Sequence, residues 1–174
     1  MNPSLVGSEM CIRDSVICYP QGTADQNGDN FWNVGYNFHN NINVDDVSFI
    51  LSLAEYLQNE YGYDANNTFA AGMSNGAEMS YKLACEADGF FKAIAPVAGT
   101  MFGVSWTSCN PGSMPVLEIH GTNDNVTLWD GDYNDTYWGP YPGTEEVIDF
   151  WVLENDCINN CLLYTSPSPR DSDS

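Results

Sequence analysis

The chain has 174 residues, of which 24 are acidic and 4 are lysine or arginine, giving a formal net charge of −20 at pH 7. Such a charge repels phosphate backbones and anionic lipid headgroups, so it disfavours nucleic acids and membrane surfaces as partners. No apolar run reaches the roughly 18 residues that a membrane-spanning helix needs.

The two ends of the sequence differ in character from its middle. Residues 5–14 (LVGSEMCIRD) and 161–170 (CLLYTSPSPR) can be encoded by opposite strands of one DNA sequence that resembles a sequencing adapter. Protein folding gives no reason for such a relation. We therefore expect residues 1–15 and 161–174 to be adapter-derived, to form no domain and to pack poorly. Residues 16–160 are then a partial domain, incomplete at both ends.

The first elements of this domain are a strand and a loop. Residues 16–22 (VICYPQG) form a short apolar run closed by proline and glycine, which predicts a buried strand. Residues 23–44 are rich in Asn, Gly and aromatic side chains, which predicts a long irregular loop.

A helix is predicted from residue 45 or 46 to residue 61. Asp45 or Asp46 is a suitable N-cap, and Gly62 is a suitable C-terminal stop. Apolar side chains recur at three- and four-residue spacing and define one helix face. These are Val47, Ile50, Ala54, Leu57 and Tyr61.

Strands and helices alternate in the rest of the chain. Strands are predicted at 67–73, 92–99 and 114–121, and helices at 74–86 and 144–155. The last helix has an apolar set comprising Val147, Phe150, Trp151 and Leu153. This alternation predicts an α/β fold with a mostly parallel sheet and helices on both of its faces.

Four cysteines lie between the adapter-like ends, and their spacing does not fit a zinc site. Cys18 lies in an apolar strand pattern, which favours a buried free thiol. Cys85 and Cys109 lie in segments at the solvent edge and are a possible disulfide pair. For Cys157 we expect a disulfide partner in the part of the domain that the truncation removes.

The motif Gly72-Met73-Ser74-Asn75-Gly76 falls between a predicted strand and a predicted helix. In that context G-x-S-x-G is typical of a nucleophile elbow, where a tight turn exposes the serine hydroxyl and side chains at the glycines would clash. Ser74 is thus the candidate nucleophile, and the backbone N–H of Asn75 is a candidate oxyanion donor. The alternative is a serine that only caps the helix.

Asp124 is the candidate acid of a catalytic triad. It follows the predicted strand 114–121, in the chain order Ser…Asp…His found on α/β-hydrolase sheets. The alternative is an aspartate that only stabilises a polar turn. Asp130 and Asp132 are weaker candidates for the acid.

Neither histidine of the chain is well placed to be the base. His120 lies four residues before Asp124, so we expect it beside the turn of that aspartate and not across the cleft from it. His39 lies upstream of Ser74, out of order for this fold, and is expected to be an exposed loop residue.

Five blocks in this order resemble the polyhydroxybutyrate depolymerase/feruloyl esterase group of secreted α/β-hydrolases. They are VDDVSFI, GMSNGAEMSYKLACE, IAPVAGTM, PVLEIHGTNDN and EEVIDFWVLENDC. The resemblance implies that Ser74 is the nucleophile and Asp124 the acid. It places the catalytic histidine in a later motif, which this chain does not reach, and one oxyanion donor in an earlier strand. It also makes Trp32 and Asn33 candidate substrate-binding residues, with surface packing as the alternative.

The sequence therefore predicts a serine esterase acting on polymeric or oligomeric esters: polyhydroxyalkanoate, or feruloylated or acetylated polysaccharide. No metal or organic cofactor is implied. The resemblance implies a secreted protein, and the 174-residue chain itself is expected to be inactive. The alternatives are a serine peptidase, a dienelactone-type hydrolase, or a non-catalytic carbohydrate-binding protein. The last would use exposed aromatic side chains at Trp32, Tyr36, Tyr137, Trp138 and Tyr141.

Overall fold

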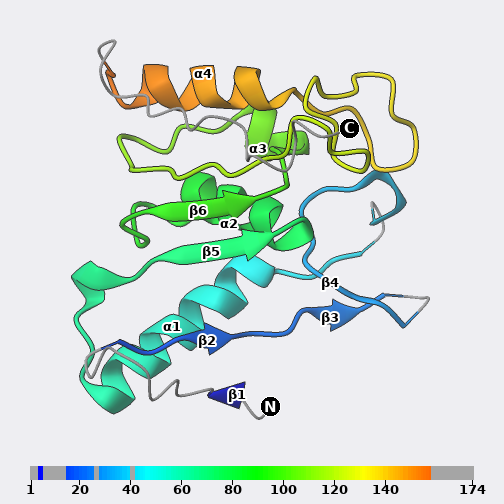
Figure 1. Ribbon diagram of the computed structural model, residues 1–174. Helices are drawn as coiled ribbons and strands as arrows, with labels where there is room; N and C mark the ends of the chain where they lie inside the picture. The colour runs from blue at the N-terminus through cyan, green and yellow to red at the C-terminus, as the bar shows by residue number, and fades with distance from the viewer. Residues whose placement is uncertain (1–3, 6–14, 26–27, 40–41, 158–174) are drawn as a thin grey trace, which may run out of the picture.

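Figure 1 shows the computed structural model, which describes residues 4–5, 15–25, 28–39 and 42–157. Both predicted adapter-derived ends lie largely outside these ranges. The strands and helices, in chain order, are β1 Ser4–Leu5, β2 Cys18–Tyr19, β3 Thr23–Ala24, β4 Asn30–Phe31, α1 Asp46–Tyr61, β5 Ala70–Met73, α2 Asn75–Glu86, β6 Ile94–Val97, α3 Gly103–Thr107 and α4 Thr144–Glu154. Two 3₁₀ turns lie at Asn37–His39 and Ala65–Asn67.

A parallel sheet forms the centre of the fold. Strands β5 and β6 lie side by side and run in the same direction, with Ala70 opposite Ile94 (Figure 1). Residues 115–119 extend the sheet on the other side of β6 through parallel bridges at Val116 and Ile119. The predicted strands at 67–73 and 92–99 are thus confirmed as parallel neighbours. The predicted strand at 114–121 is present only as two isolated parallel bridges to β6.

The predicted helix at residues 45–61 is present as α1. Asp45 is its N-cap and accepts a hydrogen bond from the Ser48 N–H at 3.0 Å. Gly62 ends the helix in the left-handed region, at φ 68°. Tyr61 was assigned to the apolar face but is 51% exposed, because the last turn extends beyond the core.

The hydrophobic core lies on one face of the sheet. Helix α2 packs directly against β5 and β6, and its Tyr81 ring stacks on Trp151 of α4 with centroids 6.3 Å apart. Val47 of α1 and Ile94 of β6 join the same buried cluster. Leu153 was predicted to belong to the apolar face of α4 but is 76% exposed.

The opposite face of the sheet is exposed, contrary to the prediction of helices on both faces. Alternate residues of parallel strands point to opposite faces. On the outer face Met73, Leu117 and Ile119 are 71%, 60% and 51% exposed. Within the described ranges α1, α2 and α4 all contribute to the core on the inner face. Parallel sheets are normally covered on both faces, and the prediction relied on that general rule.

The apolar run at residues 16–22 is not the buried strand that the sequence predicts. Its strand β2 pairs antiparallel with β1, separately from the β5–β6 sheet. Ile17 and Tyr19 are 55% and 62% exposed, because no described element covers them. Cys18 is a free thiol that is half-buried, and desolvation raises its pKa.

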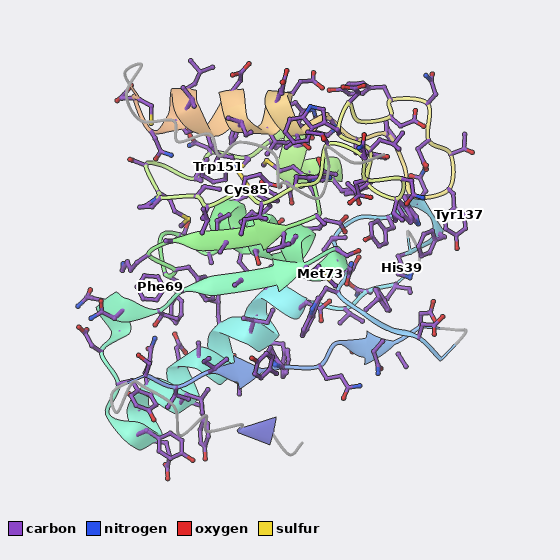
Figure 2. The ribbon with its side chains drawn as sticks, in the orientation of Figure 1. His39, Phe69, Met73, Cys85, Tyr137 and Trp151 are labelled. Carbon is purple, nitrogen blue, oxygen red and sulfur yellow. A yellow bond between two sulfur atoms is a disulfide. The ribbon has the colours of Figure 1, made fainter. Side chains whose placement is uncertain are left out.

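A disulfide joins Cys85 near the end of α2 to Cys109 in the loop after α3, which confirms the predicted pair. The two Cα atoms are 5.0 Å apart, within the range that a disulfide spans. Figure 2 shows Cys85 between the sheet and α4. Among the described helices, none is both long enough and apolar enough to cross a membrane.

Candidate active site

Ser74 occupies a sharp turn between β5 and α2. Its backbone has φ 53° and ψ −122°, a region that side chains other than glycine rarely adopt. The turn is held by three backbone hydrogen bonds: Ser74 N–H donates to Val97 O at 2.9 Å, and Ser74 O accepts from the N–H groups of Ala77 at 2.8 Å and Glu78 at 3.1 Å. The Ser74 hydroxyl makes no capping hydrogen bond to α2, and the residue is exposed. This geometry is typical of a nucleophile elbow and disfavours the helix-cap alternative.

The two glycines of the motif have different roles. A Cβ on Gly72 would lie 2.2 Å from the carbonyl oxygen of Gly76, so Gly72 is required for the helix to approach the strand. A Cβ on Gly76 would meet no atom within 4 Å. The prediction that a side chain would clash at either glycine is therefore correct for Gly72 and wrong for Gly76, whose backbone is the surface that Gly72 contacts.

Asn75 begins α2 and ties it to the loop that carries Trp32. The Asn75 side chain accepts from Trp32 N–H at 2.6 Å and donates to Trp32 O at 3.0 Å. Its backbone N–H belongs to the helix N-terminus, where partial positive charge favours a developing oxyanion. The oxyanion role of Asn75 stays a prediction.

The structure places the two candidate substrate-binding residues differently. Trp32 is partly exposed and stacks on Phe49 of α1 with centroids 6.4 Å apart. The Asn33 side chain instead donates to the carbonyl oxygens of Ile42 and Val44, and its N–H donates to Asp46. These contacts favour the packing alternative for Asn33 and leave Trp32 beside the elbow, joined to it by Asn75.

A buried carboxylate under the elbow is the main feature that the sequence analysis missed. Glu78, in the first turn of α2, is 3% exposed and accepts a hydrogen bond from the Tyr36 hydroxyl. Burial raises the pKa of Glu78 to about 7, although hydrogen bonds from Tyr36 and Asn75 act in the opposite direction. Burial and the Glu78 charge raise the pKa of Tyr36 well above its usual value. The sequence carries one signal for the burial of Glu78: it lies three residues before Tyr81 and therefore shares the helix face of that large aromatic residue.

Asp124 lies at the same edge of the sheet as Ser74, in the turn after residues 115–119. Its N–H donates to Gly121 O at 3.1 Å, and its Oδ1 accepts from the N–H groups of Val126 and Thr127. Asp124 therefore stabilises its own turn, as the alternative interpretation proposes, and its Oδ2 lies 3.7 Å from His120 Nε2. Residues 115–119 are not next to β5, because β6 lies between them.

His120 lies beside Asp124 as expected, with its ring nitrogens facing acceptors. Nε2 is 2.8 Å from Thr127 O and 3.7 Å from Asp124 Oδ2, and Nδ1 is 3.3 Å from Glu118 Oε1. Burial alone lowers the pKa of His120, but the hydrogen bonds to Glu118 and Thr127 and the charges of Glu118 and Asp124 raise it overall. Because both ring nitrogens face acceptor oxygens, His120 is a poor candidate for the general base.

His39 is buried at 4% exposure, so the prediction of an exposed loop histidine is wrong. The cause is a cluster of aromatic rings formed within its own loop, where Phe31 lies 3.7 Å from the His39 ring centroid. Its Nε2 lies 3.7 Å from Asp25 Oδ2. Figure 2 shows His39 beyond the Met73 end of β5, close to Tyr137.

The weaker acid candidates and the aromatic platform are also located. Asp130 is exposed, and Asp132 Oδ1 accepts from the Asn134 N–H in a local turn. Of the five aromatic residues proposed as an exposed stacking surface, Tyr36 and Tyr141 are core residues at 8% and 2% exposure. Tyr137 is 66% exposed, whereas Trp32 and Trp138 are partly buried. Their burial weakens the carbohydrate-binding alternative.

A strained serine between a parallel strand and a helix, with a carboxylate after a later segment of the same sheet, is typical of the α/β-hydrolase fold. The fold is similar to that of the carboxylesterase of Bacillus cereus, with a TM-score of 0.57 and 21% sequence identity. That likeness covers 81% of this chain and 62% of the solved one. The model of the prolyl oligopeptidase family matches residues 10–111, which is more than half of the sequence. The chain therefore belongs to the prolyl oligopeptidase family.

Several fungal esterases are similar in sequence. Probable feruloyl esterase C of Aspergillus niger is 35% identical over 119 residues, which are 67% of this chain and 38% of that protein. Feruloyl esterase C of Emericella nidulans is 37% identical over 52% of this chain and 33% of its own length. Feruloyl esterase B of Piromyces equi is 28% identical over 76% of this chain and 27% of its own length. The chain thus spans well under half the length of these relatives.

Proposed function

We propose that the protein is a serine-dependent carboxylic ester hydrolase whose substrates are esters borne by polymers or their fragments. The observation that carries the proposal is the strained Ser74 turn, which leaves the hydroxyl exposed and without a bond to the helix. Ser74 would attack the acyl carbon, the Asn75 N–H would stabilise the oxyanion, and Asp124 would orient the base. The names of the feruloyl esterase relatives support ester chemistry.

Among polymer esters we propose feruloylated polysaccharide in preference to polyhydroxyalkanoate or acetylated polysaccharide. The relatives named as feruloyl esterases support this choice. A polymer cannot enter a cell, so the protein would act outside it. The Cys85–Cys109 disulfide is compatible with an oxidising compartment of that kind.

We further propose that the base is supplied by neither histidine of this chain. His120 is engaged with Glu118 and Thr127, and His39 is enclosed by aromatic rings. The 174-residue chain alone should then retain only weak catalysis, because loss of one triad member leaves the contributions of oxyanion stabilisation and substrate binding.

The experiment compares the 174-residue chain with a version extended by its flanking genomic sequence, on methyl ferulate and a chromogenic short-chain ester. We expect turnover from the extended protein that Ser74→Ala abolishes. Ser80→Ala is the matched control, because that serine lies on the same helix and its hydroxyl bonds to Gly76 O. Turnover unaffected by Ser74→Ala would refute the proposed nucleophile. Cleavage of a prolyl peptide substrate in preference to esters would favour the peptidase alternative, which the family description supports.

A further inference from the structure

Glu78 carries a buried carboxylate that has no cationic partner within the described ranges. Two lysines lie in these ranges, and both are engaged elsewhere: Lys82 Nζ is 3.5 Å from Glu86, and Lys92 Nζ donates to Gly89 O at 2.9 Å. The charge of Glu78 is therefore offset by hydrogen bonds and by the positive end of α2. A buried charge of this kind costs stability, and local rules are most often broken at functional sites.

A series of hydrogen bonds connects Glu78 to Trp32 through Tyr36 and Asn75. We call residues 30–36 the Trp32 loop. An ionised carboxylate can only accept, so it fixes the hydroxyl hydrogen of Tyr36 toward itself. The oxygen of Tyr36 is then free to accept from Asn75 Nδ2 at 3.3 Å. Asn75 in turn holds both the N–H and the carbonyl of Trp32.

The ring of Tyr36 is itself held in place by contacts with other aromatic rings. Its ring meets Phe102 edge-on with centroids 5.2 Å apart and stacks on Trp138 at 6.1 Å. Loss of the Glu78 carboxylate would leave the Tyr36 ring in place but release the orientation of its hydroxyl. The hydrogen bonds between Asn75 and Trp32 should weaken as a result, without any general unfolding of the protein.

We propose that Glu78 is a positioning residue that fixes the Trp32 loop against the first turn of α2 through Tyr36 and Asn75. The loop is thereby held beside Ser74. This inference deepens the proposed ester hydrolase function and rests on it for the role of the loop in substrate binding. The buried charge of Glu78 lowers stability, and its hydrogen bonds order the loop next to Ser74.

The test is hydrogen exchange of the Trp32 amide in the 174-residue chain, measured by NMR. In Glu78→Met and in Tyr36→Phe we expect exchange to be faster by roughly tenfold, the equivalent of one lost hydrogen bond. Glu78→Met should meanwhile be at least as stable to urea as the parent, because an apolar side chain replaces a buried charge. Glu118→Gln is the matched control, because it alters the bond that α2 makes through Tyr81 and should leave Trp32 unchanged.

Unchanged exchange at Trp32 in both variants would overturn the proposal. So would a uniform acceleration at all amides that follows a lower global stability, because Glu78 would then be a structural residue only. The ester assay on the extended protein separates the two hypotheses: without Ser74-dependent turnover the proposed function fails, whereas faster Trp32 exchange in the two variants would still support the positioning role.

Discussion

The burial of Glu78 predicts that stability depends on pH in a way that one substitution should remove. Burial raises the pKa of this carboxyl from 4.5 to about 7. The folded protein therefore binds a proton more tightly than the unfolded chain between these values. The resulting stability is fully present below about pH 4.5 and is lost as the pH rises to about 7. At about 1.4 kcal/mol per pH unit, the loss is about 3 kcal/mol.

Glu78→Gln should abolish this dependence, because the amide retains an acceptor for Tyr36 but does not ionise. The difference in unfolding free energy between variant and parent should be near zero at pH 4.5. It should grow in favour of the variant to about 3 kcal/mol at pH 8. Urea unfolding of both proteins at pH 4.5, 6, 7 and 8 measures it, and the titration of other carboxylates cancels in the difference.

Tyr36→Phe is the control that acts in the opposite direction. It removes a hydrogen bond that favours the ionised carboxylate, so the pKa of Glu78 should rise further and the loss of stability should extend above pH 7. If parent and Glu78→Gln show the same pH dependence between pH 4.5 and 8, Glu78 is not a buried ionisable group of the kind described.

Three further predictions concern stability and are checked by urea unfolding. Gly72→Ala should cost about 3 kcal/mol or more through backbone overlap, whereas Gly76→Ala should be neutral or stabilising by up to about 1 kcal/mol; similar losses for both would contradict the geometry of the elbow. Cys109→Ser should cost about 3 kcal/mol, for a sequence separation of 24 between the paired cysteines, and reductant should then have no further effect. His120 has a raised pKa, so the stability that its protonation contributes is present below about pH 6.5 and is lost as the pH rises through the folded-state pKa. His120→Asn should therefore destabilise more at pH 5.5 than at pH 8.5, and equal losses at both would show that the ring is not protonated between its acceptors.

The features that the sequence predicted well depend on short stretches of chain. The Asp45 cap and the Gly62 stop of α1 each depend on residues within one turn. The Ser74 turn likewise follows from five consecutive residues between a strand and a helix. The Cys85–Cys109 pair is less local, but it could be predicted because few cysteines, and so few possible pairs, lie between the two ends of the sequence.

The features that the sequence did not predict depend on contacts between distant residues. Tyr36 and Glu78 are 42 positions apart, and neither carries a local signal that it would meet the other. The burial of His39 depends on how its loop folds over its own aromatic rings. The exposed outer face of the sheet depends on which side each helix takes, and alternation of strands and helices does not determine that side.

The environment of the elbow is suited to the charge that ester hydrolysis creates. Strain at a residue such as Ser74 costs about 1–3 kcal/mol and persists only where surrounding contacts enforce it. Here the close approach of Gly72 to Gly76, the bond from Ser74 N–H to Val97 O and the Asn75–Trp32 pair act on the same turn. A base that takes the serine proton becomes a cation, and a chain of net charge −20 favours that cation. The elbow thus favours negative charge locally at the helix N-terminus, while the rest of the molecule favours the positive charge that must form beside it.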